Sequence, residues 1–151
     1  MYNLRKTVIA FFGVGFIPRF PGTLTSALTV IIVFLLQKKL PPEIVQLPLL
    51  FGSSLLLFLL YRSSDGKDPV WITLDEVAGQ SLALMKFCGG SRLDIKHCII
   101  GFILFRFFDI VKPPPIKQLQ RLKGAFGILI DDLAAGLVSF ALLNLLCLLF
   151  L

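Results

Sequence analysis

Two adjacent aspartates, Asp131 and Asp132, interrupt a long apolar run near the C-terminal end of the sequence. An ionised carboxylate in apolar surroundings is costly unless a partner neutralises it, and two like charges side by side increase that cost. Each carboxylate would raise the pKa of the other, or a cation would bind between them. The sequence therefore predicts that a compensating cation lies near this pair.

Other residues in the chain could complete a site for a metal and a phosphate. Carboxylates favour a hard cation such as Mg²⁺, which often bridges protein carboxylates and a substrate phosphate. Such an ion polarises a phosphoryl oxygen and lowers the pKa of a bound water. Arginine, lysine and the free amides at a helix N-terminus bind phosphate oxygens. Together these groups predict a metal-assisted phosphate hydrolase.

The candidate residues fall into two sets. The expected Mg²⁺ ligands, one of which would act as general base on the attacking water, are Asp75, Glu76, Asp109, Asp131 and Asp132. The expected phosphate-binding residues are Arg106, Lys112, Gly22 and Thr23.

Other phosphatase chemistries lack their residues. The only histidine, His97, is expected at the opposite side of the membrane and at a surface or interface, so a phosphohistidine intermediate is excluded. No Cys-x₅-Arg motif is present, and Asp65 and Asp68 do not have the Asp-x-Asp spacing of aspartyl-phosphate enzymes. Asp65 and Lys67 are typical of a solvated loop.

Composition favours a membrane protein. Only 16% of the residues are charged and 56% are hydrophobic, with a mean hydropathy of +0.88, whereas soluble domains have about 25% charged residues. The net charge of +6 points to anionic lipid headgroups, and no basic cluster with interleaved aromatics suggests nucleic acid. Three cysteines without a framework spacing, Cys88, Cys98 and Cys147, predict buried, reduced thiols.

The 151 residues suit one domain, residues 1–151, and no sustained period-two alternation supports strands. We expect an all-α, membrane-embedded, compact bundle of about five long helices and a short N-terminal helix. That short helix, interfacial or re-entrant, is expected at residues 8–17, and Thr23 or Thr25 is expected to cap the next one. The long helices are expected at residues 24–36, 44–61, 72–88, 97–111 and from 126 to the C-terminus.

If residues 8–17 do not cross the membrane, the N-terminus and the loops at 62–70 and 112–124 share one side. This side carries more lysine and arginine, so the positive-inside rule makes it cytoplasmic. The same assignment brings all the candidate site residues to this face. The oligomeric state is left open.

Simpler interpretations exist for single residues. Asp75 and Glu76 could stabilise a helix N-terminus, Asp109 and Lys112 could form a helical ion pair, and Arg106 could extend to the interface. A small transporter or proton-coupled channel could also use buried acids, although its acids should be spread along the depth of the membrane. A non-catalytic scaffold would not need the acidic pairs.

Four motifs follow one another along the chain. They are Gly13-x-Gly15-x-x-Pro18-x-x-Pro21–Gly22–Thr23-x-x-Ser26, then Asp68–Pro69 ahead of Asp75–Glu76-x-x-Gly79, Phe105–Arg106-x-Phe108–Asp109-x-x-Lys112–Pro113-x-Pro115–Ile116, and Gly127-x-x-Ile130–Asp131–Asp132-x-x-Ala135–Gly136. Together they resemble the phosphatidylglycerophosphatase A family of bacterial membrane lipid phosphatases. Thr25 and Leu74 depart from the usual pattern, and neither removes a candidate ligand.

The resemblance covers nearly the whole chain and implies a specific reaction. That reaction is the Mg²⁺-dependent hydrolysis of phosphatidylglycerophosphate, an anionic phospholipid, to phosphatidylglycerol and phosphate. The resemblance also implies an all-helical bundle, located in the bacterial inner membrane with its active site facing the cytoplasm.

Overall fold

Every regular element in the described part of the chain is a helix. The computed structural model describes residues 4–66, 69–86, 92–119 and 122–150. Its main helices are α2 (Pro21–Leu36), α3 (Pro42–Leu60), α4 (Leu74–Ala83), α5 (Ile95–Val111) and α7 (Gly124–Phe150). The shorter elements are α1 (Leu4–Ile9), α6 (Ile116–Leu119) and the 3₁₀ turns η1 (Val14–Phe16) and η2 (Ser63–Asp65). The predicted all-α fold is confirmed.

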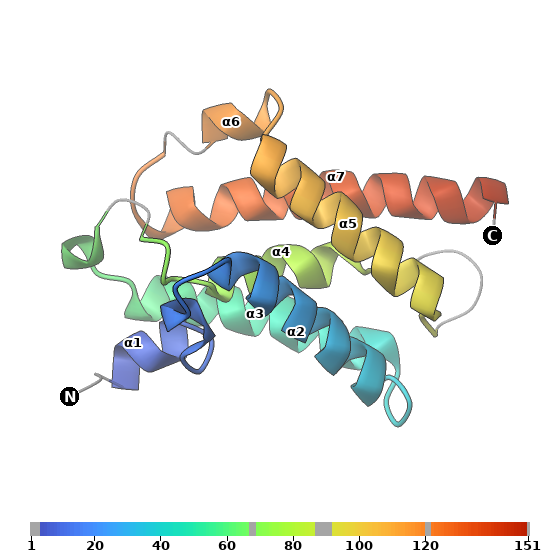
Figure 1. The fold of residues 1–151 in the computed structure, drawn as a ribbon, viewed down its shortest axis with the longest axis horizontal. Coiled ribbons are helices and arrows are strands. Elements are labelled where there is room, and N and C mark those ends of the chain that lie inside the picture. The colour runs from blue at the N-terminus through green and yellow to red at the C-terminus, as the bar shows by residue number, and fades with distance from the viewer. Residues whose placement is uncertain (1–3, 67–68, 87–91, 120–121, 151) are drawn as a thin grey trace.

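The short helix α4 lies at the centre of the bundle. It packs against α2, α3, α5 and α7, and Figure 1 shows it between α7 on one side and the α2–α3 pair on the other. Glycines allow the close approach of α4 and α7, because a Cβ on Gly136 would collide with the carbonyl of Gly79. A Cβ on Gly79 would collide with the ring of Phe105 and the carbonyl of Asp132. The backbones of the helix that carries Asp75 and the helix that carries Asp132 therefore lie in close contact.

Two helices, α3 and α7, are long and apolar enough to cross a membrane. Within the most apolar 18-residue stretch of each helix, only 22% of α3 and 33% of α7 is buried inside the molecule. Most of their apolar side chains therefore lie on its outer surface. A core helix of a soluble protein would instead be mostly buried. The surface of the bundle therefore favours a lipid environment, as the composition predicted.

The helix ends that were expected on one side of the membrane lie at the same end of the bundle. The helix α1, the turn η2 and the start of α7 lie at one end of the bundle, and the α2–α3 connection and the C-terminus lie at the other (Figure 1). The first turns of α2 and α4 and the last turn of α5 therefore meet near the start of α7.

The N-terminal segment differs from the expected helix at residues 8–17. Helix α1 ends at Ile9, and Phe11, Phe12 and Gly13 then adopt positive φ values of 44°, 56° and 99°. Left-handed conformations cannot continue a right-handed helix, so the chain turns sharply before η1. Hydropathy alone did not show this turn, because the turning residues are themselves apolar.

Side chains from neighbouring helices satisfy the backbone carbonyls that follow the C-terminal end of α4. Helix α4 ends inside the bundle, and the carbonyl of Leu84 accepts a hydrogen bond from Gln46 Nε2 at 3.1 Å. His97 Nε2 lies 3.3 Å from the same oxygen, and Asn144 donates to the carbonyl of Met85. The expectation that His97 lies at a surface is wrong, because this side chain is buried against the end of α4.

A partly buried ion pair joins the N-terminal helix to the loop before α4. Arg5 donates two hydrogen bonds to Asp65, at 2.6 and 2.7 Å, and a third to the carbonyl of Leu60. The prediction that Asp65 is solvated is therefore wrong, since its side chain is almost completely buried; Lys67 lies outside the described residues. Cys98 and Cys147 are buried, reduced thiols as predicted, and Cys88 lies outside the described residues.

Candidate active site

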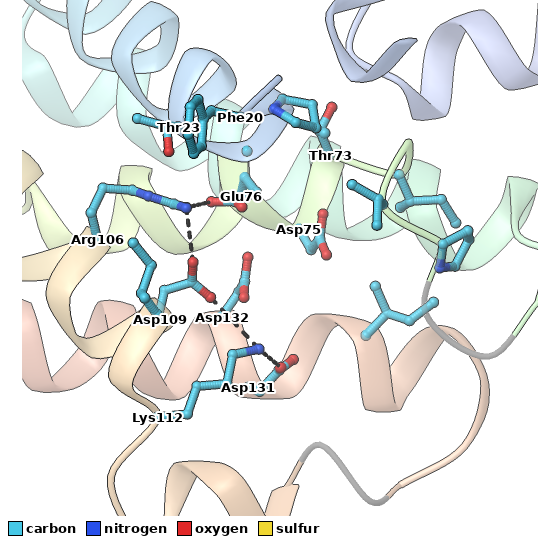
Figure 2. Close-up of a pocket in the computed structure, with 17 residues that line it drawn as sticks. Phe20, Thr23, Thr73, Asp75, Glu76, Arg106, Asp109, Lys112, Asp131 and Asp132 are labelled. Carbon is cyan, nitrogen blue, oxygen red and sulfur yellow. Dashed lines mark hydrogen bonds and ion pairs between the residues drawn. The ribbon is translucent and has the colours of Figure 1, made fainter. Parts of the chain in front are cut away.

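All nine predicted site residues line a single cavity of about 440 Å³. The cavity lies where the first turns of α2 and α4, the last turn of α5 and the second turn of α7 meet. Its polar lining comes from Thr73 and from the predicted residues: Gly22, Thr23, Asp75, Glu76, Arg106, Asp109, Lys112, Asp131 and Asp132. Figure 2 shows their charged groups pointing toward one another across the cavity. The sequence-based expectation that acids from three helices meet at one end is confirmed.

Helix α2 begins with backbone geometry suited to the cavity wall. Phe20 precedes the helix in a left-handed conformation, and Pro21 starts the first turn without needing a backbone hydrogen bond. Neither Thr23 nor Thr25 is the N-cap, because the helix begins at Pro21 and no side chain caps it. The amide of Thr23 therefore belongs to a first turn whose N–H groups have no partner within the helix.

Gly22 is needed for the close contact between α2 and α4. A Cβ at this position would collide with Glu76 Oε1 and would lie 3.4 Å from Arg106 Nη1. Ser26, one turn later, has its hydroxyl 2.9 Å from Glu76 Oε2 and 3.0 Å from the Gly22 carbonyl. Ser26 belongs to the first sequence motif but was not predicted as a site residue, although its spacing from Gly22 places both residues on one helix face.

Two cations at the end of α5 connect three of the five carboxylates. Arg106 lies 2.5 Å from Glu76 and 2.8 Å from Asp109. Lys112 lies 2.5 Å from Asp131 and 3.7 Å from Asp109. The ion pairs thus link Glu76 on α4 to Asp131 on α7 through the last turn of α5 (Figure 2). Arg106 points into the cavity and does not extend to the interface.

Lys112 is held in place by the local backbone. It adopts a left-handed conformation at the C-terminus of α5, which ends the helix just before the three consecutive prolines. Partial burial lowers the pKa of its ammonium group, but the hydrogen bond that it donates to Asp131 and the nearby carboxylates outweigh burial and raise this pKa above its usual value. Lys112 therefore stays positively charged over the physiological pH range, so it suits phosphate binding rather than proton donation.

None of the ion pairs described above includes Asp132. It is buried, and its Oδ2 atom accepts no hydrogen bond from any described residue. It interacts electrostatically with the four other acids of the cavity. If all five acids are ionised, the cavity has three more negative than positive charges, so it attracts a cation.

The donor chemistry of this cavity fits Mg²⁺. Carboxylate oxygens are its preferred protein ligands, and the unsatisfied Oδ2 of Asp132 is such an oxygen. Within the described residues, no three acidic, histidine or cysteine side chains already surround one point as a metal cage. Mg²⁺ does not require such a cage, because it keeps several waters and is commonly bound by one or two carboxylates together with substrate phosphate.

The acids are not spread along the depth of the bundle, as a proton-coupled channel would require. They lie at one end, with two cations between them, in a cavity large enough for a phosphate and its attached group. The fold and site therefore define a class: a helical, membrane-type protein with a carboxylate-rich pocket for a phosphate ester.

Comparison with known proteins identifies the family within this class. The family model described as phosphatidylglycerophosphatase A matches residues 7–147, and the chain belongs to this family. Its members are lipid phosphatases, which hydrolyse phosphoric monoesters. No solved structure matches the chain at a significant level.

Three curated relatives cover most of the chain. A Bacteroides thetaiotaomicron protein, provisionally named as a phosphatidylinositol-3-phosphatase, is 34% identical over 87% of this chain and 86% of its own length. The phosphatidylglycerophosphatase A of Escherichia coli is 32% identical over 87% of this chain and 77% of its own. The phosphatidylglycerophosphatase A of Haemophilus influenzae is 34% identical over 85% of this chain and 79% of its own length.

Proposed function

We propose that this protein is a Mg²⁺-dependent phosphatase that hydrolyses phosphatidylglycerophosphate to phosphatidylglycerol and inorganic phosphate. The observation that carries the proposal is the single cavity in which five carboxylates from three helices surround Arg106 and Lys112. Two relatives named phosphatidylglycerophosphatase A support this substrate. The protein would act in the bacterial inner membrane as a multi-pass protein with the cavity on the cytoplasmic side.

The two cations are suited to bind the phosphate group. Arg106 offers a planar fork and Lys112 a point charge, and both lie at the wall of the cavity. Both are already paired with carboxylates, so a phosphate would share these cations with Glu76, Asp109 and Asp131. The free amides in the first turn of α2 add donors on the facing wall.

The acids serve two roles in this proposal. Asp75, Glu76, Asp109, Asp131 and Asp132 are the candidates to hold the metal, which when bound would withdraw charge from a phosphoryl oxygen. One of the same carboxylates would accept a proton from the water that attacks phosphorus. The bond between phosphorus and the glycerol oxygen then breaks, and that oxygen leaves with a proton from solvent.

The direct test is phosphate release by the purified protein in detergent micelles. We expect phosphate release from phosphatidylglycerophosphate with Mg²⁺, loss of release with EDTA and recovery when Mg²⁺ is restored. Phosphatidylinositol 3-phosphate should be assayed in parallel, because the name of the Bacteroides relative points to it. A preference for that lipid would overturn the proposed substrate, and release that is unaffected by EDTA would overturn the proposed metal.

A further inference from the structure

The cavity has an apolar rim as well as a charged floor. Phe20, Val70 and Ile110 belong to its lining, yet each side chain is more than two-thirds exposed to the surroundings. They come from three different segments: the residue before α2, the loop before α4 and the end of α5. A cavity for a soluble phosphate ester would gain nothing from exposed apolar side chains at its mouth.

Phe20 has an unusual backbone conformation for its position. Its φ of 55° and ψ of 46° lie in the left-handed region, which a bulky non-glycine residue rarely adopts. Strained conformations of this kind persist at ligand-binding sites when the surrounding structure enforces them. Here the conformation places the aromatic ring at the mouth of the cavity, close to Thr23 in Figure 2.

An apolar stripe on α5 continues outward from the rim. Ile99, Ile103 and Ile110 are each more than half exposed. At 100° per residue they lie within about 40° of one another around the helix, on the side next to Arg106. Eleven residues of helix span about 16 Å, which is about half of the ~30 Å hydrocarbon thickness of a bilayer. The stripe therefore has the length of one leaflet, and it ends at the cavity.

We propose that Phe20, Val70 and Ile110, together with the α5 stripe, bind the acyl-bearing part of the substrate while the charged floor binds its phosphate. The matching ligand is an amphipathic phosphate monoester with long acyl chains, which would reach the cavity sideways from one leaflet. The inference rests on the proposed function, and it makes the rim the determinant of specificity for lipid over soluble phosphate esters. The rim residues are specificity-determining and are not part of the hydrolytic chemistry.

The test compares phosphatidylglycerophosphate in mixed micelles with its deacylated, water-soluble counterpart. The measured quantity is the ratio of the two kcat/KM values for the wild type and for Phe20→Ala and Ile110→Asn. We expect each substitution to lower this ratio about tenfold, because apolar contact with the acyl region is lost. Ile110→Leu should restore most of the ratio, whereas a general loss of folding would lower both kcat/KM values together.

Two matched variants serve as controls. Phe12→Ala removes a phenylalanine that is 80% exposed and has a φ of 56°, against 76% and 55° for Phe20. Leu59→Asn changes a residue that is 69% exposed near the end of α3, against 68% for Ile110. Neither control residue lines the cavity, so both variants should keep the wild-type ratio.

The outcomes separate this inference from the proposed function. A wild-type protein that hydrolyses neither substrate would overturn the proposed function. If the wild type hydrolyses phosphatidylglycerophosphate but Phe20→Ala and Ile110→Asn both keep a kcat/KM ratio within twofold of the wild-type ratio, the rim assignment alone is overturned. Equal kcat/KM values of the wild type for the lipid and for its deacylated form would also overturn the rim assignment.

Discussion

At the residue scale, the site depends on carboxylates whose partners are far away in sequence. Asp131 is paired with Lys112 at 2.5 Å, although nineteen residues separate them. Asp132 is buried without a hydrogen bond to its Oδ2 atom from the described residues. The free-energy cost of burying Asp131 and Asp132 made these two residues conspicuous in the sequence. The cations near them, Arg106 and Lys112, offset this cost and are also the side chains expected to bind phosphate.

Asp131→Asn should abolish Mg²⁺-dependent phosphate release while leaving the protein folded. The amide keeps the size of the carboxylate but removes its charge, so the pairing with Lys112 and the candidate metal oxygen are lost. We expect kcat to fall at least about 100-fold. The control is Asp94→Asn, because Asp94 caps α5 at the opposite end of the bundle and asparagine is an equally good cap. Turnover retained by Asp131→Asn would remove this residue from the site.

Gly22→Ala should impair activity more than stability. Its Cβ would occupy the space of Glu76 Oε1, so the Glu76–Arg106 pair would have to move away from α2. We expect kcat/KM to fall at least about tenfold, in line with the sensitivity of catalysis to small displacements. Gly52→Ala is the matched control, since no atom lies within 4 Å of its added Cβ and alanine favours the helix. Equal activity of the two variants would contradict the role of Gly22.

The nine residues that the sequence predicted for the site line one cavity, and their roles stay predictions. The surroundings of two residues outside the site were misjudged. Charge and spacing were sufficient for the cluster, because buried acids and cations must meet. His97 and Asp65 were misjudged because their partners, the Leu84 carbonyl and Arg5, are set by the fold and not by local sequence. The apolar rim was also missed, since Val70 and Ile110 are ordinary residues in an apolar chain.

At the element scale, the loop before α4 is attached to α1 through Arg5 and Asp65. The hydrogen bonds from Arg5 hold the pKa of the Asp65 carboxyl below its usual value. The stabilisation by this pair is therefore complete above the usual aspartate pKa of about 4 and is lost as the pH falls through the lower pKa of the folded protein. The same loop leads into the first turn of α4, so its attachment also positions Asp75.

Asp65→Asn should lower the free energy of unfolding at neutral pH by about 1–3 kcal/mol, because two charge-assisted hydrogen bonds are lost. Thermal unfolding of this variant and the wild type in detergent, followed from pH 7 to pH 3, measures the effect. The difference should stay constant down to about pH 4 and shrink below it. A difference that does not depend on pH would mean that the charge of Asp65 is not involved.

Helix boundaries were predicted less accurately than helix positions. The sequence indicated a helix at residues 72–88, but α4 ends at Ala83, and the chain that follows is fixed by Gln46, His97 and Asn144. These contacts join helices that are distant in sequence, so a local pattern cannot contain them. The turn at Phe11 and Phe12 was missed for the same reason, because it depends on packing and not on turn-forming residues.

At the scale of the whole molecule, the arrangement of helix ends predicts how the protein sits in the membrane. Lys38 follows α2 at the end opposite the cavity, and Ser64 lies in η2 at the cavity end; both are exposed. With the cavity facing the cytoplasm, the two positions should lie on opposite sides of the bilayer.

A cysteine-labelling experiment measures this orientation. Lys38→Cys and Ser64→Cys would be made in a protein whose three native cysteines are replaced by alanine. A membrane-impermeant maleimide added to spheroplasts should label the Lys38→Cys variant, and it should label the Ser64→Cys variant only after lysis. Labelling of both variants before lysis would contradict the cytoplasmic location of the cavity.

The brevity of α4 has a consequence for how the protein is made. Ten residues are too few to cross a bilayer, so the membrane-insertion machinery cannot recognise this helix as a span of its own. The chain at its C-terminal end needs Gln46, His97 and Asn144, and the last of these lies on α7, which is synthesised after α2, α3 and α5. Two of the five acids, Asp131 and Asp132, also arrive with α7. A nascent chain without α7 therefore lacks part of the candidate site, and we expect the enzyme to gain its activity only once α7 is synthesised and docked.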